Sequence, residues 1–167
     1  LVDQRLSFAQ FVAFDVGANA YLRPANLQKS VSATLTGIEE LKKYLRNDDF
    51  WEELYYWIDG EKTVYSAAGT TDAQIFLSAK LGLDAARGAA FEQALRDLEA
   101  ARTFEIERGG EREIYYAIPV KRYDLNVRAT VIFRMSGAEC NRVLGGILAE
   151  SGGACLLDDA GRVLGGL

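Results

Sequence analysis

Residues 112–135, REIYYAIPVKRYDLNVRATVIFRM, constrain the fold more than any other part of the sequence. Apolar side chains recur at every second position on both sides of a polar turn at residues 121–126, which is the period of a β-strand. The stretch therefore predicts two long antiparallel strands, and residues 104–107 ahead of it predict a third. In the first of the two long strands one face would carry Ile114, Tyr116, Ile118 and Val120, and the other Tyr115, Ala117 and Pro119.

Residues 1–48 have the period of helices instead. Residues 1–21 carry a wide apolar face, and Pro24 interrupts the pattern. From Asn26 onwards apolar residues recur at steps of three or four and share one stripe of a helix: Leu27, Val31, Leu35, Ile38, Leu41 and Leu45. We expect these N-terminal helices to lie along the sheet.

The remaining segments add strands and helices in a mixed order. Residues 50–66 predict a hairpin, and Thr71 followed by Gln74 has the form of a capping box, so that residues 67–102 are expected to be a helical insert. Residues 136–152 predict a helix, and residues 154–164 predict a final hairpin whose turn contains Asp159 and Gly161.

This order predicts an α+β fold, in which an antiparallel sheet of about five strands carries a long N-terminal helix and further helices. A chain of 167 residues is long enough for one domain. Within that domain we expect helices at 1–48, the sheet with its insert at 49–135, and a helix and hairpin at 136–167.

The composition argues against catalysis and against a metal site. The chain has no histidine, which removes the commonest general base and metal ligand. It has no glycine-rich phosphate loop, and Cys140 and Cys155 alone cannot form a zinc site; they are either unpaired core thiols or a disulfide. Neighbouring carboxylates such as Asp48 and Asp49 point to opposite sides of an extended chain. We therefore predict no enzyme, no catalytic residue, no metal and no cofactor.

The charge and the hydropathy limit the partners. Nineteen basic residues stand against 24 acidic ones, a net charge of −5 without a basic run, so we expect this segment not to contact nucleic acid. No apolar run approaches the roughly 20 residues that span a bilayer. Because the sequence begins at Leu1, we expect a piece of a longer protein whose flanking segments provide any membrane anchor.

Aromatic residues on the predicted strands are candidates for a small-molecule pocket: Tyr55, Trp57, Tyr65 and Tyr116. The alternative for each of them is packing in the core. Arg128 and Arg134 interrupt an otherwise apolar strand. Arg128 would anchor a carboxylate ligand if it faces the helical insert, and would be an ordinary polar side chain if it faces water.

Four segments in order resemble Cache-type extracytoplasmic sensor domains, the PAS-like modules of bacterial receptors. They are the amphipathic helix ending near Asn47, ELYYWIDGEKTVYSAAG, IYYAIPV followed by NVRATVIFRMS, and GGACLLDDAGRVL. The resemblance implies a domain outside the cytoplasm of a membrane protein, with a small molecule or peptide as its ligand. The final hairpin would either end the PAS-like unit or begin a second, membrane-proximal unit.

The sequence of the second segment is most similar to the external domains of membrane-anchored AraC-type transcription regulators. The tyrosine, arginine and aspartate signature of amino-acid sensors is not clear in this chain, so the resemblance does not name a ligand. The alternatives are the sensor domain of a histidine kinase or chemoreceptor, or a module that binds no small ligand. In that last case the N-terminal helices would pair with a second copy to form a homodimer.

Overall fold

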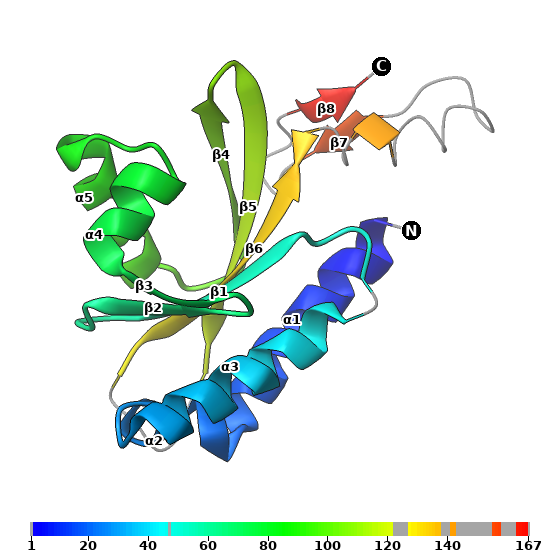
Figure 1. Ribbon diagram of the computed structural model, residues 1–167. Helices are drawn as coiled ribbons and strands as arrows, with labels where there is room; N and C mark the ends of the chain where they lie inside the picture. Colours follow the sequence, from blue (N-terminus) through cyan, green and yellow to red (C-terminus); the bar gives the residue numbers. More distant parts are fainter. Residues whose placement is uncertain are drawn as a thin grey trace.

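A computed structural model describes residues 2–46, 48–121, 127–137, 141–142, 155–157 and 163–166. Helices precede the sheet and interrupt it between two of its strands (Figure 1). The helices are α1 (Val2–Ala18), the 3-10 turn η1 (Ala20–Leu22), α2 (Pro24–Leu27), α3 (Val31–Leu45), α4 (Ala73–Ile75), the π-helix η2 (Phe76–Lys80) and α5 (Ala85–Arg96). We call residues 73–96 the cover.

Six strands form one antiparallel sheet in the order β3-β2-β1-β6-β5-β4. Their bounds are β1 (Glu53–Ile58), β2 (Thr63–Ser66), β3 (Gly69–Asp72), β4 (Arg102–Arg108), β5 (Glu111–Val120) and β6 (Ala129–Ser136). The last two strands, β7 (Cys155–Leu157) and β8 (Val163–Gly166), pair with each other in a separate sheet. The α+β fold with an antiparallel sheet and an N-terminal helix is thereby confirmed.

Helices cover both faces of the six-stranded sheet, because its central strands are apolar on both sides (Figure 1). On one face α1 and α3 bury Val12, Val16 and Leu41 against alternate residues of the strands: Leu54, Tyr56, Ile114, Tyr116, Val131 and Phe133. On the other face the cover buries Phe76, Leu77, Phe91 and Leu95 against the intervening residues: Tyr55, Trp57, Tyr115, Ala117 and Ile132. The predicted alternation of residues 114–118 between two faces is confirmed.

Polar contacts join α1 and the residue after it to α3 and the loop that follows α3. Arg5 of α1 pairs with Asp48 at 3.0 Å, and the amide of Asn19 donates to Glu40 of α3 at 3.0 Å. The hydroxyl of Tyr44 donates to Asp15. These contacts place the two helices beside each other on the sheet.

The prediction for residues 67–102 was wrong in one part. Gly69–Asp72 form the strand β3, paired with β2, and make the sheet one strand larger than expected. Thr71 lies in this strand opposite Val64, so it does not cap the helix. Asp72 does so instead, and its Oδ1 accepts from the N–H groups of Gln74 and Ile75.

The single helix expected from Asn26 is two helices. Its pattern breaks at residues 28–30, where Ser30 caps α3 by accepting from the N–H of Ala33. Of the expected stripe, Leu27 and Leu41 are fully buried, whereas Val31 is 78% exposed and Leu35 57% exposed. The N-terminal half of α3 therefore extends beyond the sheet.

Several predictions lie outside the described residues. They include most of the helix at 136–152, the turn with Asp159 and Gly161, and the state of Cys140. For the same reason the alternatives for the final hairpin and for the two cysteines stay predictions.

Substitution of Gly17 tests how closely α1 approaches the backbone at the end of β5. A methyl group on Gly17 would lie 2.8 Å from the backbone oxygen of Lys121, whereas one on Gly88 of α5 would meet only Leu77 at an ordinary 3.6 Å. We expect Gly17→Ala to lower the free energy of unfolding by about 1–3 kcal/mol, because the backbone must move. Gly88→Ala should raise it by up to about 1 kcal/mol. Chemical denaturation measures both, and an equal effect of the two substitutions would contradict this packing.

Candidate functional site

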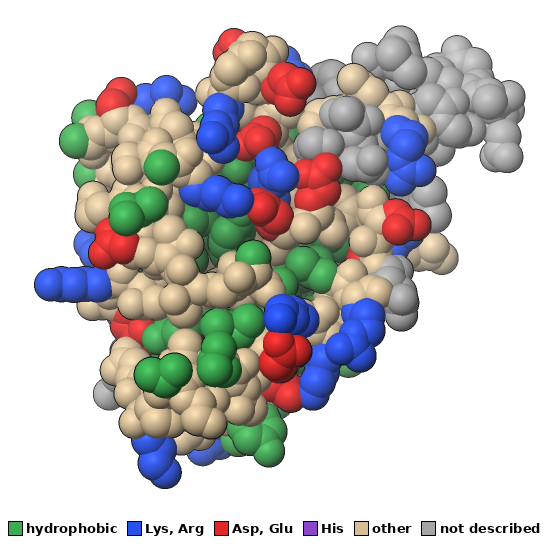
Figure 2. All heavy atoms as spheres, viewed as in Figure 1, with side chains coloured by type: hydrophobic (Ala, Val, Ile, Leu, Met, Phe, Trp, Pro, Cys, Tyr) green, Lys and Arg blue, Asp and Glu red, His purple; other side chains and the backbone are tan. Residues whose placement is uncertain are grey.

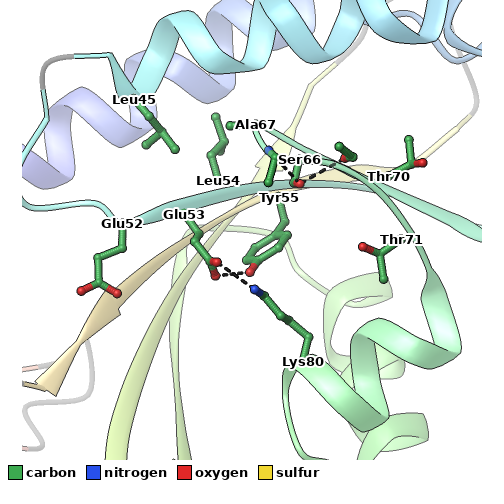
Figure 3. A pocket seen from close by; sticks show the side chains of 12 residues that line it. Leu45, Glu52, Glu53, Leu54, Tyr55, Ser66, Ala67, Thr70, Thr71 and Lys80 are labelled. Atoms are coloured by element: carbon green, nitrogen blue, oxygen red, sulfur yellow. Dashed lines mark hydrogen bonds and ion pairs between the residues drawn. The ribbon is translucent and has the colours of Figure 1, made fainter.

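A groove of 270 Å³ lies at the edge of β1 (Figure 3). Four parts of the chain form it: the end of α3, the first half of β1, the turn between β2 and β3, and the end of η2. Its lining residues are Leu45, Glu52, Glu53, Leu54, Tyr55, Ser66, Ala67, Ala68, Gly69, Thr70, Thr71 and Lys80. We call this cavity the groove.

The groove exists because β2 is shorter than β1. β2 pairs with β1 only at Tyr55 and Tyr56, and the chain then turns away into β3. Gly69, with φ of +140°, allows this turn. The start of β1 keeps its partner β6 on one side, and on the other it receives one 3.4 Å hydrogen bond, from the N–H of Ala67 to the carbonyl of Leu54. The space left beside Glu53 and Leu54 is the groove.

Glu53 forms the polar floor of the groove (Figure 3). The ammonium group of Lys80 donates to its Oε1 at 2.8 Å, and the hydroxyl of Tyr55 donates to its Oε2. Glu53 and Tyr55 share a face because they lie two residues apart on one strand. Lys80 reaches them from the cover, so this contact ties the cover to the sheet.

Arg134 of β6 holds the carboxylates around the groove. Its guanidinium lies 2.8 Å from Glu52, 2.9 Å from Glu53 and 2.7 Å from Glu113. The contact of its Nε with Glu53 is an ion pair without hydrogen-bond alignment. Tyr115 donates to Glu113 at 2.8 Å and lies opposite Arg134 in the ladder. We call Glu52, Glu53, Glu113, Arg134, Tyr55 and Tyr115 the charged network.

The electrostatics of the network favour an ionised carboxylate at the groove. Burial alone would raise the pKa of Glu53, but hydrogen bonds from Lys80 and Tyr55 and the charge of Arg134 outweigh it, so this pKa lies below its usual value. Burial and the neighbouring carboxylates raise the pKa of Tyr55 and of Tyr115. Both hydroxyls are therefore donors at neutral pH. Among the residues that line the groove, the carboxylates of Glu52 and Glu53 stand against the single ammonium of Lys80, an excess of one negative charge.

Among the described residues no group of three or more His, Cys, Asp or Glu side chains could hold a metal ion. The same part of the chain contains no helix that is both long and apolar enough to cross a membrane.

Of the five predicted ligand residues, Tyr55 is the one that lines the groove within the described part of the chain. Trp57 lies beneath the cover against Phe76. Tyr65 and Tyr116 lie in the cluster on the opposite face of the sheet. Arg128 reaches the far end of the cover, where its Nη1 donates to the carbonyl of Arg96 at 2.5 Å.

Sequence reasoning missed the acidic and basic residues of the groove. Glu53 could have been found from its position two residues before Tyr55 on the same strand face. Arg134 was visible as a charge in an apolar strand, but its three carboxylate partners were not. Lys80 gave no local signal, because its partner lies 27 residues earlier in the chain.

Comparison with solved structures identifies the fold. The chain is similar to the extracellular domain of vpHK1S-Z8, named as a histidine kinase, with a TM-score of 0.59 and 11% identity over 85% of this chain. It is also similar to the ligand-binding domain of the amino-acid chemoreceptor PctC of Pseudomonas aeruginosa PAO1 in complex with GABA, with a TM-score of 0.53 and 12% identity over 98% of this chain. The chain therefore has a PAS-like α+β fold, which it shares with these two domains.

The match covers only part of each similar structure. The chain spans 54% of the length of the first and 66% of the second. No family model matches the sequence, and a search of curated proteins gives no match.

Removing the cation of the charged network should lower the free energy of unfolding more than removing a cation from an exposed ion pair. Arg134→Gln leaves three carboxylates close together without their shared partner, and we expect it to lower the free energy of unfolding by about 2 kcal/mol. Lys42→Gln removes a cation from the exposed pair with Glu39. This substitution should change the free energy of unfolding by less than about 0.5 kcal/mol. Urea denaturation of both variants measures the difference. A cost for Arg134→Gln as small as that for Lys42→Gln would show that the network does not stabilise the fold.

Proposed function

We propose that this chain is the extracytoplasmic ligand-sensing domain of a bacterial transmembrane signalling protein and binds a small solute in the groove. The observation that carries the proposal is the groove itself, whose floor is an ionised carboxylate with a tyrosine hydroxyl and a lysine ammonium beside it. The excess negative charge favours a solute with a cationic amine. The chemoreceptor domain with the similar fold is described with GABA, which carries such a group.

The position of the groove provides a route for signalling. Leu45 connects it to α3 and Lys80 connects it to the cover, while Glu53 belongs to the sheet. A solute in the groove therefore touches three elements at once. It would shift the domain between two states if it contacts these elements differently in each state, which requires different affinities for the two.

A more specific proposal concerns the output domain of the whole protein. From the sequence of residues 53–69 we infer a membrane-anchored AraC-type transcription regulator. The segments that flank this chain would provide the anchor. A histidine kinase or a chemoreceptor is the alternative, and the two similar structures favour it at least as well. Sequencing the coding region downstream distinguishes the outputs, because a helix-turn-helix domain, a kinase domain or a signalling coiled coil would follow.

A substitution that fills the groove tests the proposed ligand site. Ala68 lines the groove and is exposed in the turn between β2 and β3. We expect Ala68→Phe to occupy the groove and to leave the charged network intact. A thermal-shift screen of amino acids and small amines, γ-aminobutyrate included, should give compounds that raise the melting temperature of the parent chain and not that of Ala68→Phe.

The matched control is Ala89→Phe, on an exposed position of α5 that does not line the groove. This variant should respond to each compound as the parent does. A screen in which no compound raises the parent's melting temperature, or in which Ala68→Phe responds equally, would contradict the proposal.

A homodimer through the N-terminal helices is a second proposal, favoured by exposed aromatic residues on α1. Phe11 is 60% exposed and Phe14 is 72% exposed, on the side of α1 opposite Ala9, Val12 and Val16, which are buried against the sheet. Burying two phenylalanines against a second copy would be favourable.

We therefore expect the parent chain to associate at high concentration, and Phe14→Ser to weaken the association by at least about tenfold. Ile75→Ser is the control, because Ile75 is also exposed but lies on α4 in the cover. Sedimentation velocity at a series of concentrations measures both variants. A parent chain that stays monomeric throughout would rule out the dimer.

A further inference from the structure

A second cavity, of 180 Å³, lies at the opposite end of the cover from Lys80. Leu95, Leu98 and Glu99 form one wall, at and just beyond the end of α5. The other walls come from the neighbouring ends of β5 and β6, at residues 119–121 and 128–130. No residue of this cavity also lines the groove.

Thr130 contributes a hydroxyl-bearing side chain to this cavity. Only 4% of the residue is exposed, and it lines the cavity. A threonine hydroxyl can donate one hydrogen bond, so it can donate to an oxygen atom of a ligand in this cavity.

The charges of the cavity favour an anion. Among the described lining residues, Arg128 and Lys121 provide two cations against the carboxylate of Glu99. The hydrogen bond from Nη1 of Arg128 to the carbonyl of Arg96 holds the guanidinium at the end of the cover. A guanidinium has five N–H groups in a planar fork, so several remain to donate to a carboxylate.

The remaining walls are apolar. Leu95 and Leu98 are buried, and Val120 lies near them at the end of β5. We propose that this cavity binds a small organic acid. Arg128 and Thr130 donate to its carboxylate, and the two leucines contact its short carbon chain. The inference does not rest on the groove, since the two cavities have no lining residue in common.

Three probes with the same carbon chain test the charge preference: butyrate, 1-aminobutane and 1-butanol. Each is titrated into the 167-residue chain, and amide chemical shifts are followed by NMR. Butyrate should shift the amides of Leu95, Leu98 and Thr130 in a saturable manner, and the other two probes should not. Equal binding of 1-aminobutane, or no shift at these amides with butyrate, would overturn the inference.

Substitutions test whether Arg128 and Thr130 bind butyrate. Arg128→Gln should weaken butyrate binding by at least about tenfold, whereas Arg87→Gln, which removes the same charge from an exposed position of α5, should not weaken it. Thr130→Val should weaken it by about tenfold, and Thr130→Ser, which keeps the hydroxyl, should bind as the parent does. Butyrate affinity that is unchanged in both Arg128→Gln and Thr130→Val would also overturn the inference. If butyrate binds while no compound binds in the groove, this site stands and the groove proposal fails.

Discussion

The ion pairs of Arg134 organise one end of the sheet. Its guanidinium lies in the middle of three strands, on the face that otherwise packs against the apolar cover, and three carboxylates lie within 2.9 Å of it. Partly buried charges of this kind are tolerated only when they are paired and hydrogen-bonded. The network therefore fixes the position of Glu53, and with it the floor of the groove. Charged side chains also gather beside apolar patches on the visible surface (Figure 2).

The double-sided sheet explains why cavities occur at its margins. Aromatic and aliphatic side chains fill the space beneath the middle of the cover, where Trp57 and Tyr55 pack on Phe76. The groove lies at one end of the cover and the smaller cavity at the other. Exposed ion pairs hold each end, Lys80 with Glu53 and Arg96 with Asp59. Because exposed pairs contribute little free energy, the ends of the cover are its parts most easily displaced by a ligand.

Local periodicity predicted the sheet well and the site poorly. The alternation in residues 114–118 depends only on the strand itself, so both faces could be assigned from sequence. The strand β3 was missed because it depends on pairing with β2, which turn-forming residues alone did not reveal. The aromatic character of Tyr55 marked it as a candidate. The sequence did not show that Glu53 and Lys80 lie at the same site as Tyr55, because ion pairs between distant elements leave no periodic signal.

Hydrogen–deuterium exchange tests the central claim, that a solute in the groove acts on the helices as well as on the sheet. The chain is compared with and without the compound that gives the largest thermal shift. We predict slower exchange at the start of β1, in the turn between β2 and β3, at the end of α3 and in η2. Protection limited to other segments, with these four unchanged, would contradict the account.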